Sequence, residues 1–266
     1  MYHAHFGLTA TPFPSQPSAA CYVPTGGHEE VLARLEFLME TQAGSGMLVG
    51  PPGCGKTLLL EVFARQIRRR SMAAAMVSAA QADETELLFG IAAQLGVSLP
   101  ASLPQPRILR GLSDRLSELQ YERVPVAVLV DDLDRTRGER LLAIDTLLAS
   151  LQRWSGVTVV VAGTNEFLER LPTAMSRRAD LRIDVPLWDQ DEVRQFLATR
   201  LIKCGAAGTL FDDGAIAVIF EAAEGNPRRV GQLANLALIA AAANSIHEVD
   251  AAIVEEVCRE LCVSPA

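Results

Sequence analysis

One stretch of eight residues constrains the fold of this chain more than any other. It reads Gly50-Pro51-Pro52-Gly53-Cys54-Gly55-Lys56-Thr57, follows the pattern G-x-x-x-x-G-K-T and occurs once. The apolar segment Met47-Leu48-Val49 precedes it, and a helical pattern from Lys56 to Arg70 follows it. A glycine-rich turn between a strand and a helix aims backbone N–H groups and the positive end of the helix at a phosphate. The stretch therefore predicts a phosphate-binding loop.

The two residues that close the motif predict the ligand. Only Lys56 and Lys203 are lysines among the 24 Lys and Arg residues, and a compact ammonium fits between phosphates where a planar guanidinium does not. Lys56 can reach the β- and γ-phosphates of a nucleotide, and the Thr57 hydroxyl can ligate Mg²⁺. We therefore expect Mg-ATP to bind here, and we count Leu58, the next helical residue, with the eight as binding residues.

A second candidate site lies where a buried strand ends in acid. Residues 126–130 are entirely apolar, as expected of a strand covered on both faces, and Asp131-Asp132-Leu133-Asp134 follows. Asp131 would hold Mg²⁺ through water at the carboxyl end of the strand, the edge at which open α/β sheets bind ligands. The alternative for the acidic run is a cluster that caps the N-terminus of a helix.

The order of elements predicts the architecture. Strand and helix patterns alternate as far as a last, weaker strand at residues 181–185, which implies a parallel sheet with helices on both faces, a three-layer α/β fold. After Pro186 only helical patterns appear, over residues 189–203, 212–223, 227–243 and 250–261. We therefore predict a base domain, residues 1–185, and a small all-helical domain, residues 186–266. Residues 1–25 are rich in Pro, Ser, Thr and Ala and are interpreted as an extended arm of the base.

Another core strand, Val157 to Ala162, ends in Gly163-Thr164-Asn165. Neighbouring parallel strands would place Thr164 or Asn165 near the γ-phosphate, where either could orient the attacking water. The alternative is a simple polar turn that ends the strand.

Composition limits partners and compartment. The net charge of −8 argues against a chain whose whole surface grips nucleic acid, although a local basic patch would remain compatible with it. The five cysteines form no C-x-x-C pair, which fits a reducing cytosol. No signal peptide or apolar run of membrane-spanning length is found, and we expect a cytoplasmic protein.

Several of these stretches together resemble the ExeA/GspA-type AAA+ ATPases. The opening Phe6-Gly7-Leu8 and Thr11-Pro12-Phe13 is similar to the F-G-L…P-F of that family, and residues 28–35 are similar to its H-x-E-A-L-x-x-L helix. The phosphate loop, the acidic strand end, residues 163–166 and Gly225-Asn226-Pro227-Arg228 continue the resemblance over nearly the whole chain. Two departures are Asp132, where the family usually has Glu, and Thr164-Asn165, where it often has Gln-Pro.

The resemblance implies a P-loop NTPase sheet of strand order 5-1-4-3-2 with a helical lid, and ATP hydrolysis coupled to assembly or remodelling of a protein partner. It implies that Asp132 polarises the attacking water and that Arg228 closes the lid over ATP. It also implies that Arg177 or Arg178 reaches the γ-phosphate of a neighbouring subunit in a ring or filament, where it would stabilise transition-state charge. The alternative for this arginine pair is a solvated surface.

Two functions therefore remain open. One is an ATPase motor or switch that acts on an unidentified protein partner. The other is a slowly hydrolysing, ATP-dependent DNA-binding scaffold like the transposition regulators of the MuB/TnsC/TniB type. The side chain of Asp132, one methylene shorter than that of Glu, favours slow hydrolysis and so the second function. The acidic net charge disfavours DNA binding and so the same function.

Overall fold

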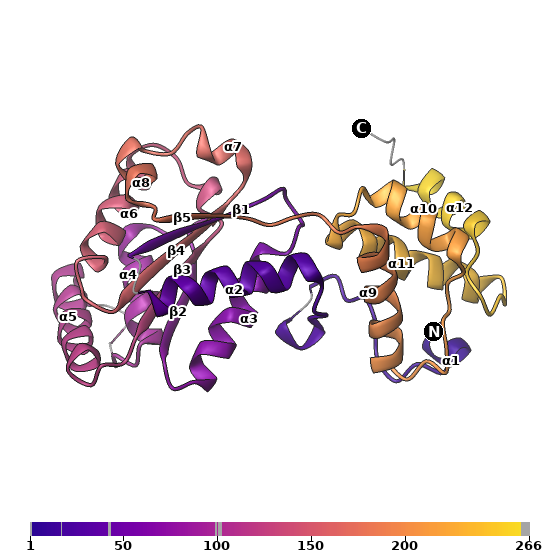
Figure 1. The fold of residues 1–266 in the computed structure, drawn as a ribbon, viewed down its shortest axis with the longest axis horizontal. Helices are drawn as coiled ribbons and strands as arrows, with labels where there is room; N and C mark the ends of the chain where they lie inside the picture. The colour runs from indigo at the N-terminus through magenta and orange to yellow at the C-terminus, as the bar shows by residue number, and fades with distance from the viewer. Residues whose placement is uncertain (1, 17, 42–43, 99, 101–102, 262–266) are drawn as a thin grey trace. The chain divides into compact units, whose positions relative to one another are not determined.

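The computed structural model describes residues 2–16, 18–41, 44–98, 100 and 103–261, and its contacts divide the chain into two compact units. The sheet unit consists of residues 30–52 and 56–185. The helical unit consists of residues 1–29, 53–55 and 186–266 (Figure 1). The sheet unit ends at Val185, and the C-terminal part of the helical unit begins at Pro186. Three residues from the middle of the phosphate loop thus pack with the helices.

Five parallel strands form the sheet, in the order β2-β3-β4-β1-β5. Counted from the other edge this is 5-1-4-3-2, so the predicted strand order is confirmed. The strands are β1 (Ser45–Val49), β2 (Ala73–Ser78), β3 (Val126–Asp131), β4 (Val157–Gly163) and β5 (Leu181–Asp184). Parallel strands carry all their carboxyl ends to one edge, and β1, β3 and β4 end there in the phosphate loop, in Asp131 and in Gly163.

The central strands are buried on both faces, which accounts for their apolar runs. Side chains of a strand alternate between faces. Val126, Val128 and Val130 of β3 join one core cluster, while Ala127 and Leu129 point to the opposite face and are also fully buried. Helices must therefore cover both sides, as Figure 1 shows for the predicted α/β class.

The helices of the sheet unit follow the sequence expectation with small shifts. The family-like helix expected at residues 28–35 is part of α2, which runs from Gly26 to Glu40. Pro106 lies in the first turn of α5, where its missing N–H costs nothing. The others are α3 (Lys56–Arg69), α4 (Glu84–Gln94), α5 (Gln105–Tyr121), η2 (Leu133–Arg135), α6 (Gly138–Leu151), α7 (Asn165–Leu168) and α8 (Thr173–Arg178).

The helical unit is built from four main helices and the start of the chain. The helices are α9 (Gln190–Lys203), α10 (Asp213–Ala223), α11 (Pro227–Ala243) and α12 (Ala251–Glu260). Asp189, Asp212, Asn226 and Asp250 cap them by accepting hydrogen bonds from N–H groups of the first turns. Among the described residues after 186, strand-type pairing is limited to one isolated bridge, between Phe211 and Val249.

The expectation of an extended arm at residues 1–25 is wrong. These residues include a short helix, α1 (Tyr2–Phe6), and a 3₁₀ turn, η1 (Ala19–Cys21), and they pack in the helical unit, whereas the sequence assigned them to the base. Phe6, Leu8 and Phe13 are buried in the core of α9 to α12. The Pro, Ser and Thr content suggested a solvated arm, but a few large apolar side chains decide where the segment packs.

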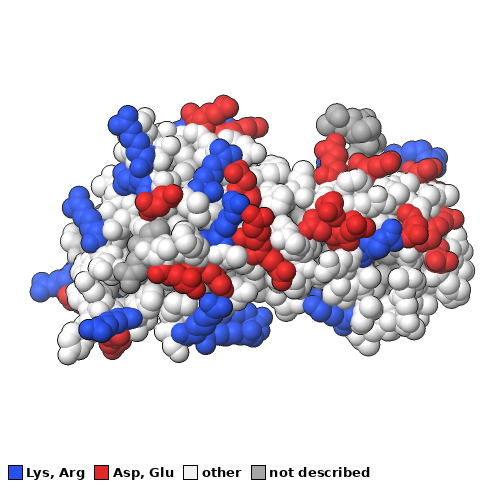
Figure 2. Space-filling view, in the orientation of Figure 1, with Lys and Arg blue, Asp and Glu red and all other residues white. Residues whose placement is uncertain are grey.

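Charge is divided unevenly between the units. The helical unit holds 6 basic and 13 acidic residues, a net charge of −7, whereas the sheet unit holds 18 and 19, a net charge of −1. Figure 2 shows one face of the molecule, on which acidic side chains predominate over the surface of the helical unit. The acidity of the whole chain is therefore a property of one unit. Within the described residues, no helix is long and apolar enough to cross a bilayer.

Candidate nucleotide-binding site

The phosphate loop joins the end of β1 to the start of α3, as its sequence predicts. Two of its glycines have left-handed backbone angles, with φ of +88° at Gly53 and +102° at Gly55. A Cβ at Gly53 would lie 2.6 Å from Oδ1 of Asn226, and a Cβ at Gly55 would lie 3.3 Å from Cε1 of His28. Backbone conformation disfavours a side chain at both positions, and space excludes one at Gly53, which leaves the loop amides accessible to a ligand.

The helical unit supports the loop through the start of α11. The N–H of Arg228 donates to the carbonyl of Gly53 at 3.3 Å, and Oδ1 of Asn226 accepts from Arg228 N–H at 3.1 Å. Gly225 cannot carry a side chain, because its Cβ would lie 2.0 Å from the carbonyl oxygen of Trp188. The G-N-P-R segment singled out in the sequence therefore lies against the phosphate loop, and the Arg228 side chain is exposed there.

Lys56 and Thr57 begin α3 and face the loop and the neighbouring strand. Nζ of Lys56 donates to the carbonyls of Gly50 and Pro51, at 2.7 and 3.0 Å. Thr57 Oγ1 donates to Oδ2 of Asp131 at 2.5 Å. The two predicted Mg²⁺ ligands are thus adjacent, although 74 residues separate them in the sequence.

Asp131 contributes a buried carboxyl to this arrangement. It is the last residue of β3 and is 3% exposed, and this burial raises the pKa of its carboxyl despite hydrogen bonds from Thr57 and from the backbone of Asp132. A raised folded-state pKa means that the group contributes most to stability below its unfolded pKa, and that this contribution is lost as the pH rises through the folded value. At neutral pH the charged carboxylate therefore costs stability.

We predict that Asp131→Asn raises the melting temperature of the nucleotide-free protein at pH 7, because it removes a desolvated charge but keeps an acceptor oxygen. The gain should shrink as the pH is lowered and the wild-type carboxyl becomes protonated. Thermal unfolding followed by circular dichroism between pH 4 and 8 measures both effects. Asp114→Asn, at an exposed position of α5, is the control. Equal changes in melting temperature in the two variants would contradict the prediction.

Asp132 has a left-handed backbone conformation with φ of 55°, and its N–H donates to Oδ1 of Asp131 at 2.9 Å. Its carboxylate accepts from Ser78 Oγ at 3.1 Å and lies 3.5 Å from Nε of Arg135. Its side chain makes no capping hydrogen bond to η2, so the capping alternative does not describe its role in this structure. Sequence reasoning missed Ser78, whose available signal was its place at the end of β2, beside Asp131 across the ladder.

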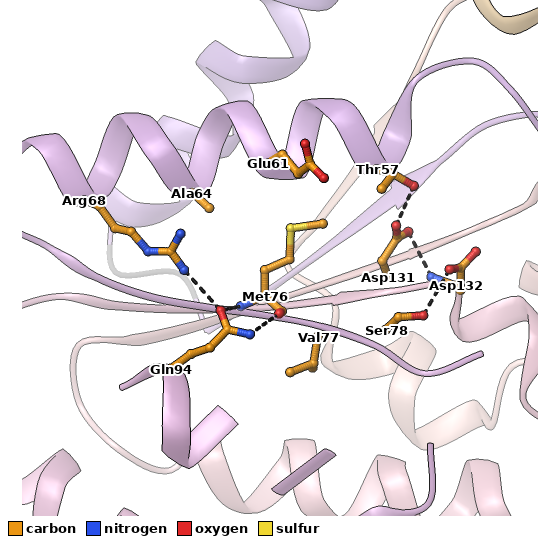
Figure 3. A pocket seen from close by; sticks show the side chains of 10 residues that line it. All are labelled: Thr57, Glu61, Ala64, Arg68, Met76, Val77, Ser78, Gln94, Asp131 and Asp132. Atoms are coloured by element: carbon orange, nitrogen blue, oxygen red, sulfur yellow. Dashed lines mark hydrogen bonds between the residues drawn. The ribbon is translucent and has the colours of Figure 1, made fainter. Parts of the chain in front are cut away.

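Thr57, Ser78, Asp131 and Asp132 border a cavity of about 490 Å³ that runs along α3 and the edge strand β2 (Figure 3). It is lined by Thr57, Glu61, Ala64 and Arg68 of α3, Met76, Val77 and Ser78 of β2, Gln94, Asp131 and Asp132. At the end away from Thr57, the Gln94 amide accepts from the N–H of Met76 and donates to its carbonyl. Arg68 donates to the carbonyl of Ala74 at 2.9 Å and to Gln94 at 3.1 Å. Side chains thus satisfy the outward backbone groups of the edge strand.

Of the two polar residues after β4, Thr164 directly follows the strand and Asn165 begins α7. The strand ends at Gly163, whose carbonyl accepts from the N–H of Gly50 at 3.3 Å. Thr164 therefore follows a residue that is hydrogen-bonded to the start of the phosphate loop. Asn165 is exposed, and Thr164 is half-buried.

The structure distinguishes the two arginines before β5. Arg178 forms an ion pair with the buried carboxylate of Asp145 on α6, and its carbonyl accepts from Ser45 Oγ. Arg177 is exposed, and no side-chain hydrogen bond or ion pair is recorded for it within the described part of the chain. Arg178 therefore links α8 to α6 and β1, while Arg177 presents its guanidinium to solvent.

A group of aromatic residues behind the loop was missed as part of the site. The ring of His28 lies between those of Tyr22 and Trp188, with centroids 6.4 and 5.6 Å away. The Tyr22 hydroxyl and the Trp188 indole N–H are buried without a hydrogen-bond partner among the described residues, and burial raises the pKa of Tyr22 to about 12. The sequence pointed only to His28, through the family-like helix. These rings come from the two ends of the chain and meet only in the folded unit.

Comparison with known proteins shows which family the chain resembles. Residues 39–171 match the model of a family described as AAA domain. General secretion pathway protein A of Aeromonas hydrophila is 26% identical over 257 residues, covering 94% of this chain and 46% of that protein. The proteasome-associated ATPase of Nakamurella multipartita is 26% identical over 173 residues, covering 59% of this chain and 28% of that protein. The chain spans less than half the length of each relative.

Solved structures show the same fold at low identity. The Aeropyrum pernix ORC1 protein, solved in complex with DNA, has a TM-score of 0.71 at 22% identity and covers 90% of this chain, which spans 66% of that one. Cdc6p of Pyrobaculum aerophilum has a TM-score of 0.73 at 19% identity, with coverages of 92% and 70%. These structures support the AAA+ fold predicted from the sequence. Half of the chain is matched by the family model, so the chain belongs to the AAA domain family, and its resemblance to the ExeA/GspA type is confirmed.

Proposed function

We propose that this chain binds and hydrolyses Mg-ATP and uses the cycle to drive assembly or remodelling of a protein partner. The observation that carries the proposal is the Thr57–Asp131 hydrogen bond at 2.5 Å, which brings two oxygen ligands together beside the phosphate loop. Hydroxyl and carboxylate oxygens suit Mg²⁺, which prefers oxygen ligands and retains several waters. A phosphate loop alone would bind an anion, and the added pair fits a metal-bound nucleotide.

Each residue then has a chemical task. The amides of residues 53–57 and the Lys56 ammonium hold the phosphates, and Thr57 and Asp131 hold the ion. Bound Mg²⁺ would neutralise charge on the phosphate oxygens. Asp132 polarises the attacking water, and Thr164 or Asn165 orients it. The hydrogen bonds from the Lys56 ammonium to the Gly50 and Pro51 carbonyls keep it at the loop.

In this proposal the helical unit contributes to the site through the start of α11. Arg228 is exposed at the start of α11, whose backbone holds Gly53, and in this proposal it contacts the phosphates. Residues 186–266 act as the lid of a base that ends at residue 185, with the first 29 residues packed in the lid core.

Turnover of ATP tests the proposal directly. We expect phosphate release by the purified chain that requires Mg²⁺ and is blocked by a slowly hydrolysed analogue. Absence of both nucleotide binding and turnover across a range of protein concentrations would refute it.

We also propose that ATP joins copies of the chain head to tail, with Arg177 acting on the γ-phosphate of the neighbour. Arg177 is free to reach another copy, whereas Arg178 is bound to Asp145. A head-to-tail contact is heterologous and forms a ring or a helical filament. We predict that light scattering shows growth with an ATP analogue for wild type, and that Arg177→Ala lowers turnover at the concentrations where wild type assembles. An arginine supplied in trans can contribute about 10³-fold or more to turnover.

Arg178→Ala should behave differently from Arg177→Ala. It leaves the buried Asp145 carboxylate without its charged partner, which typically costs about 3–5 kcal/mol, so its main effect should be a lower melting temperature. If Arg178→Ala alone lost turnover while remaining as stable as wild type, the two roles would be reversed. If the wild type stayed monomeric at every concentration, assembly itself would be ruled out.

A second candidate function is a slowly hydrolysing, ATP-dependent scaffold on DNA. Two observations favour it. Asp132 is one methylene shorter than Glu and is held by Ser78. The sheet unit is almost neutral, so the acidity of the chain does not by itself repel DNA from that unit. Turnover and filament formation measured with and without duplex DNA separate the two functions, since only the scaffold requires DNA for assembly.

A further inference from the structure

The imidazole of His28 occupies a buried position behind the phosphate loop. It belongs to the first turn of α2 and is 2% exposed. Its Nε2 lies 3.2 Å from the carbonyl oxygen of Cys54, and its Cε1 would lie 3.3 Å from a Cβ at Gly55. The ring therefore fills the space directly beneath two consecutive residues of the loop.

The contact fixes which ring nitrogen carries hydrogen. A carbonyl oxygen accepts but cannot donate, so Nε2 must carry the proton that forms this hydrogen bond. Burial lowers the pKa of His28, although the hydrogen bond to Cys54 and the Glu192 carboxylate act in the opposite direction, and the lowered pKa favours the neutral ring at physiological pH. The neutral tautomer with hydrogen on Nε2 is then the form that holds Cys54.

The geometry of the peptide group links this contact to the side of the loop that faces the ligand. The carbonyl of Cys54 and the N–H of Gly55 belong to one planar trans peptide and point in opposite directions. A group that holds the carbonyl from behind therefore aims the N–H away from itself. Backbone N–H groups turned into a concave loop are what binds a phosphate.

We propose that His28 is a positioning residue for the phosphate loop, which holds the Cys54 carbonyl and so aims the Gly55 N–H at the bound phosphates. The inference rests on the proposed ATP binding and adds a residue that is outside the loop motif.

Trp188 extends the arrangement into the helical unit and supplies a reporter. Its ring contacts that of His28, and its backbone N–H donates to the carbonyl of Gly225 at 2.9 Å, next to the segment that holds Gly53. The ring of Phe196 on α9 also contacts it in a tilted arrangement, with the ring centroids 4.7 Å apart. A change in the loop that moves His28 therefore alters the surroundings of Trp188 and should change its emission.

The test compares two replacements of His28 in a Trp154→Phe background, where Trp188 is the only tryptophan. His28→Phe keeps a ring between Tyr22 and Trp188 but removes the donor. His28→Gln places an amide N–H the same number of bonds from Cα as the imidazole Nε2. ATP affinity is measured by calorimetry with a slowly hydrolysed analogue, and Trp188 emission is recorded during the same titration.

We expect His28→Phe to weaken ATP binding about threefold to tenfold, the usual net value of one hydrogen bond. His28→Gln should recover most of the loss, and the nucleotide-dependent change in Trp188 emission should be present in wild type and His28→Gln but reduced in His28→Phe. Wild-type affinity in a folded His28→Phe protein would overturn the proposal. Equal weakening in both variants would overturn it as well, by reducing His28 to a packing role.

Two controls keep the outcomes distinct. If His28→Phe does not fold, His28→Leu makes the same comparison, because leucine also lacks a donor. Lys56→Ala separates this inference from the proposed function. If wild type and Lys56→Ala are alike in failing to bind, ATP binding itself is wrong and the positioning role falls with it. If Lys56→Ala abolishes binding and His28→Phe does not weaken it, only the positioning role fails.

Discussion

Replacing Lys56 by alanine should remove most of the affinity for ATP and leave the fold intact. The ammonium is the compact cation of the loop, and loss of a desolvated charge partner typically costs about 2–5 kcal/mol, which is at least about 30-fold in Kd. The fold should persist because the hydrogen bonds recorded for the ammonium, to the Gly50 and Pro51 carbonyls, are local to the loop. Calorimetric titration with an ATP analogue, beside a thermal melt, measures both.

Two further variants make the Lys56 result specific. Lys56→Arg keeps the charge but presents a planar guanidinium, so it should recover little of the lost affinity. Arg69→Ala removes a cation from the other end of α3, where it is exposed, and should bind ATP like the wild type. Unchanged binding in a folded Lys56→Ala protein would show that the nucleotide site is elsewhere.

Turnover should be slow in the wild type and should depend on the length of the side chain at position 132. Removing or misplacing a general base typically changes rates by about 10²–10⁴-fold. Asp132→Asn should therefore nearly abolish turnover, and Asp132→Glu should raise it by placing a carboxylate one methylene closer to the water. Single-turnover hydrolysis under saturating ATP isolates the chemical step from nucleotide binding.

The contact with Ser78 provides the control for Asp132. Its hydroxyl donates to the carboxylate at 3.1 Å, so Ser78→Ala removes one of the two side-chain contacts of the carboxylate, the other being Arg135, without changing its charge. A change in turnover in Ser78→Ala with unaltered ATP affinity is expected if Asp132 acts on the water. An Asp132→Asn protein that hydrolyses ATP at the wild-type rate would remove this residue from the mechanism.

The sheet and the loop could be predicted because their signals are local. The buried runs of β3 and β4 require cover on both faces, and the loop motif lies between its own strand and helix, so Lys56, Thr57 and Asp131 could all be named from sequence. Their side-by-side placement follows from parallel strands that end at one edge. No long-range information was needed for these features.

The remaining features depend on contacts that the sequence does not reveal. Phe13 lies in a segment of polar composition, and only the folded helices show that it is buried with them. Arg177 and Arg178 are identical in type and adjacent, and their difference depends on Asp145, more than 30 residues earlier. His28 meets Cys54 only when α2 and the loop have folded together.

The polar contacts along β2 decide how copies of this chain can join. An edge strand with open N–H and C=O groups invites another strand to pair with it, and such pairing tends towards irreversible aggregation. Here Gln94 takes both outward groups of Met76, and Arg68 takes the carbonyl of Ala74. A neighbour could extend the sheet at this edge only by breaking three hydrogen bonds. Pairing of strands at the β2 edge is therefore not expected to join copies of the chain, and the head-to-tail contact proposed above does not depend on it.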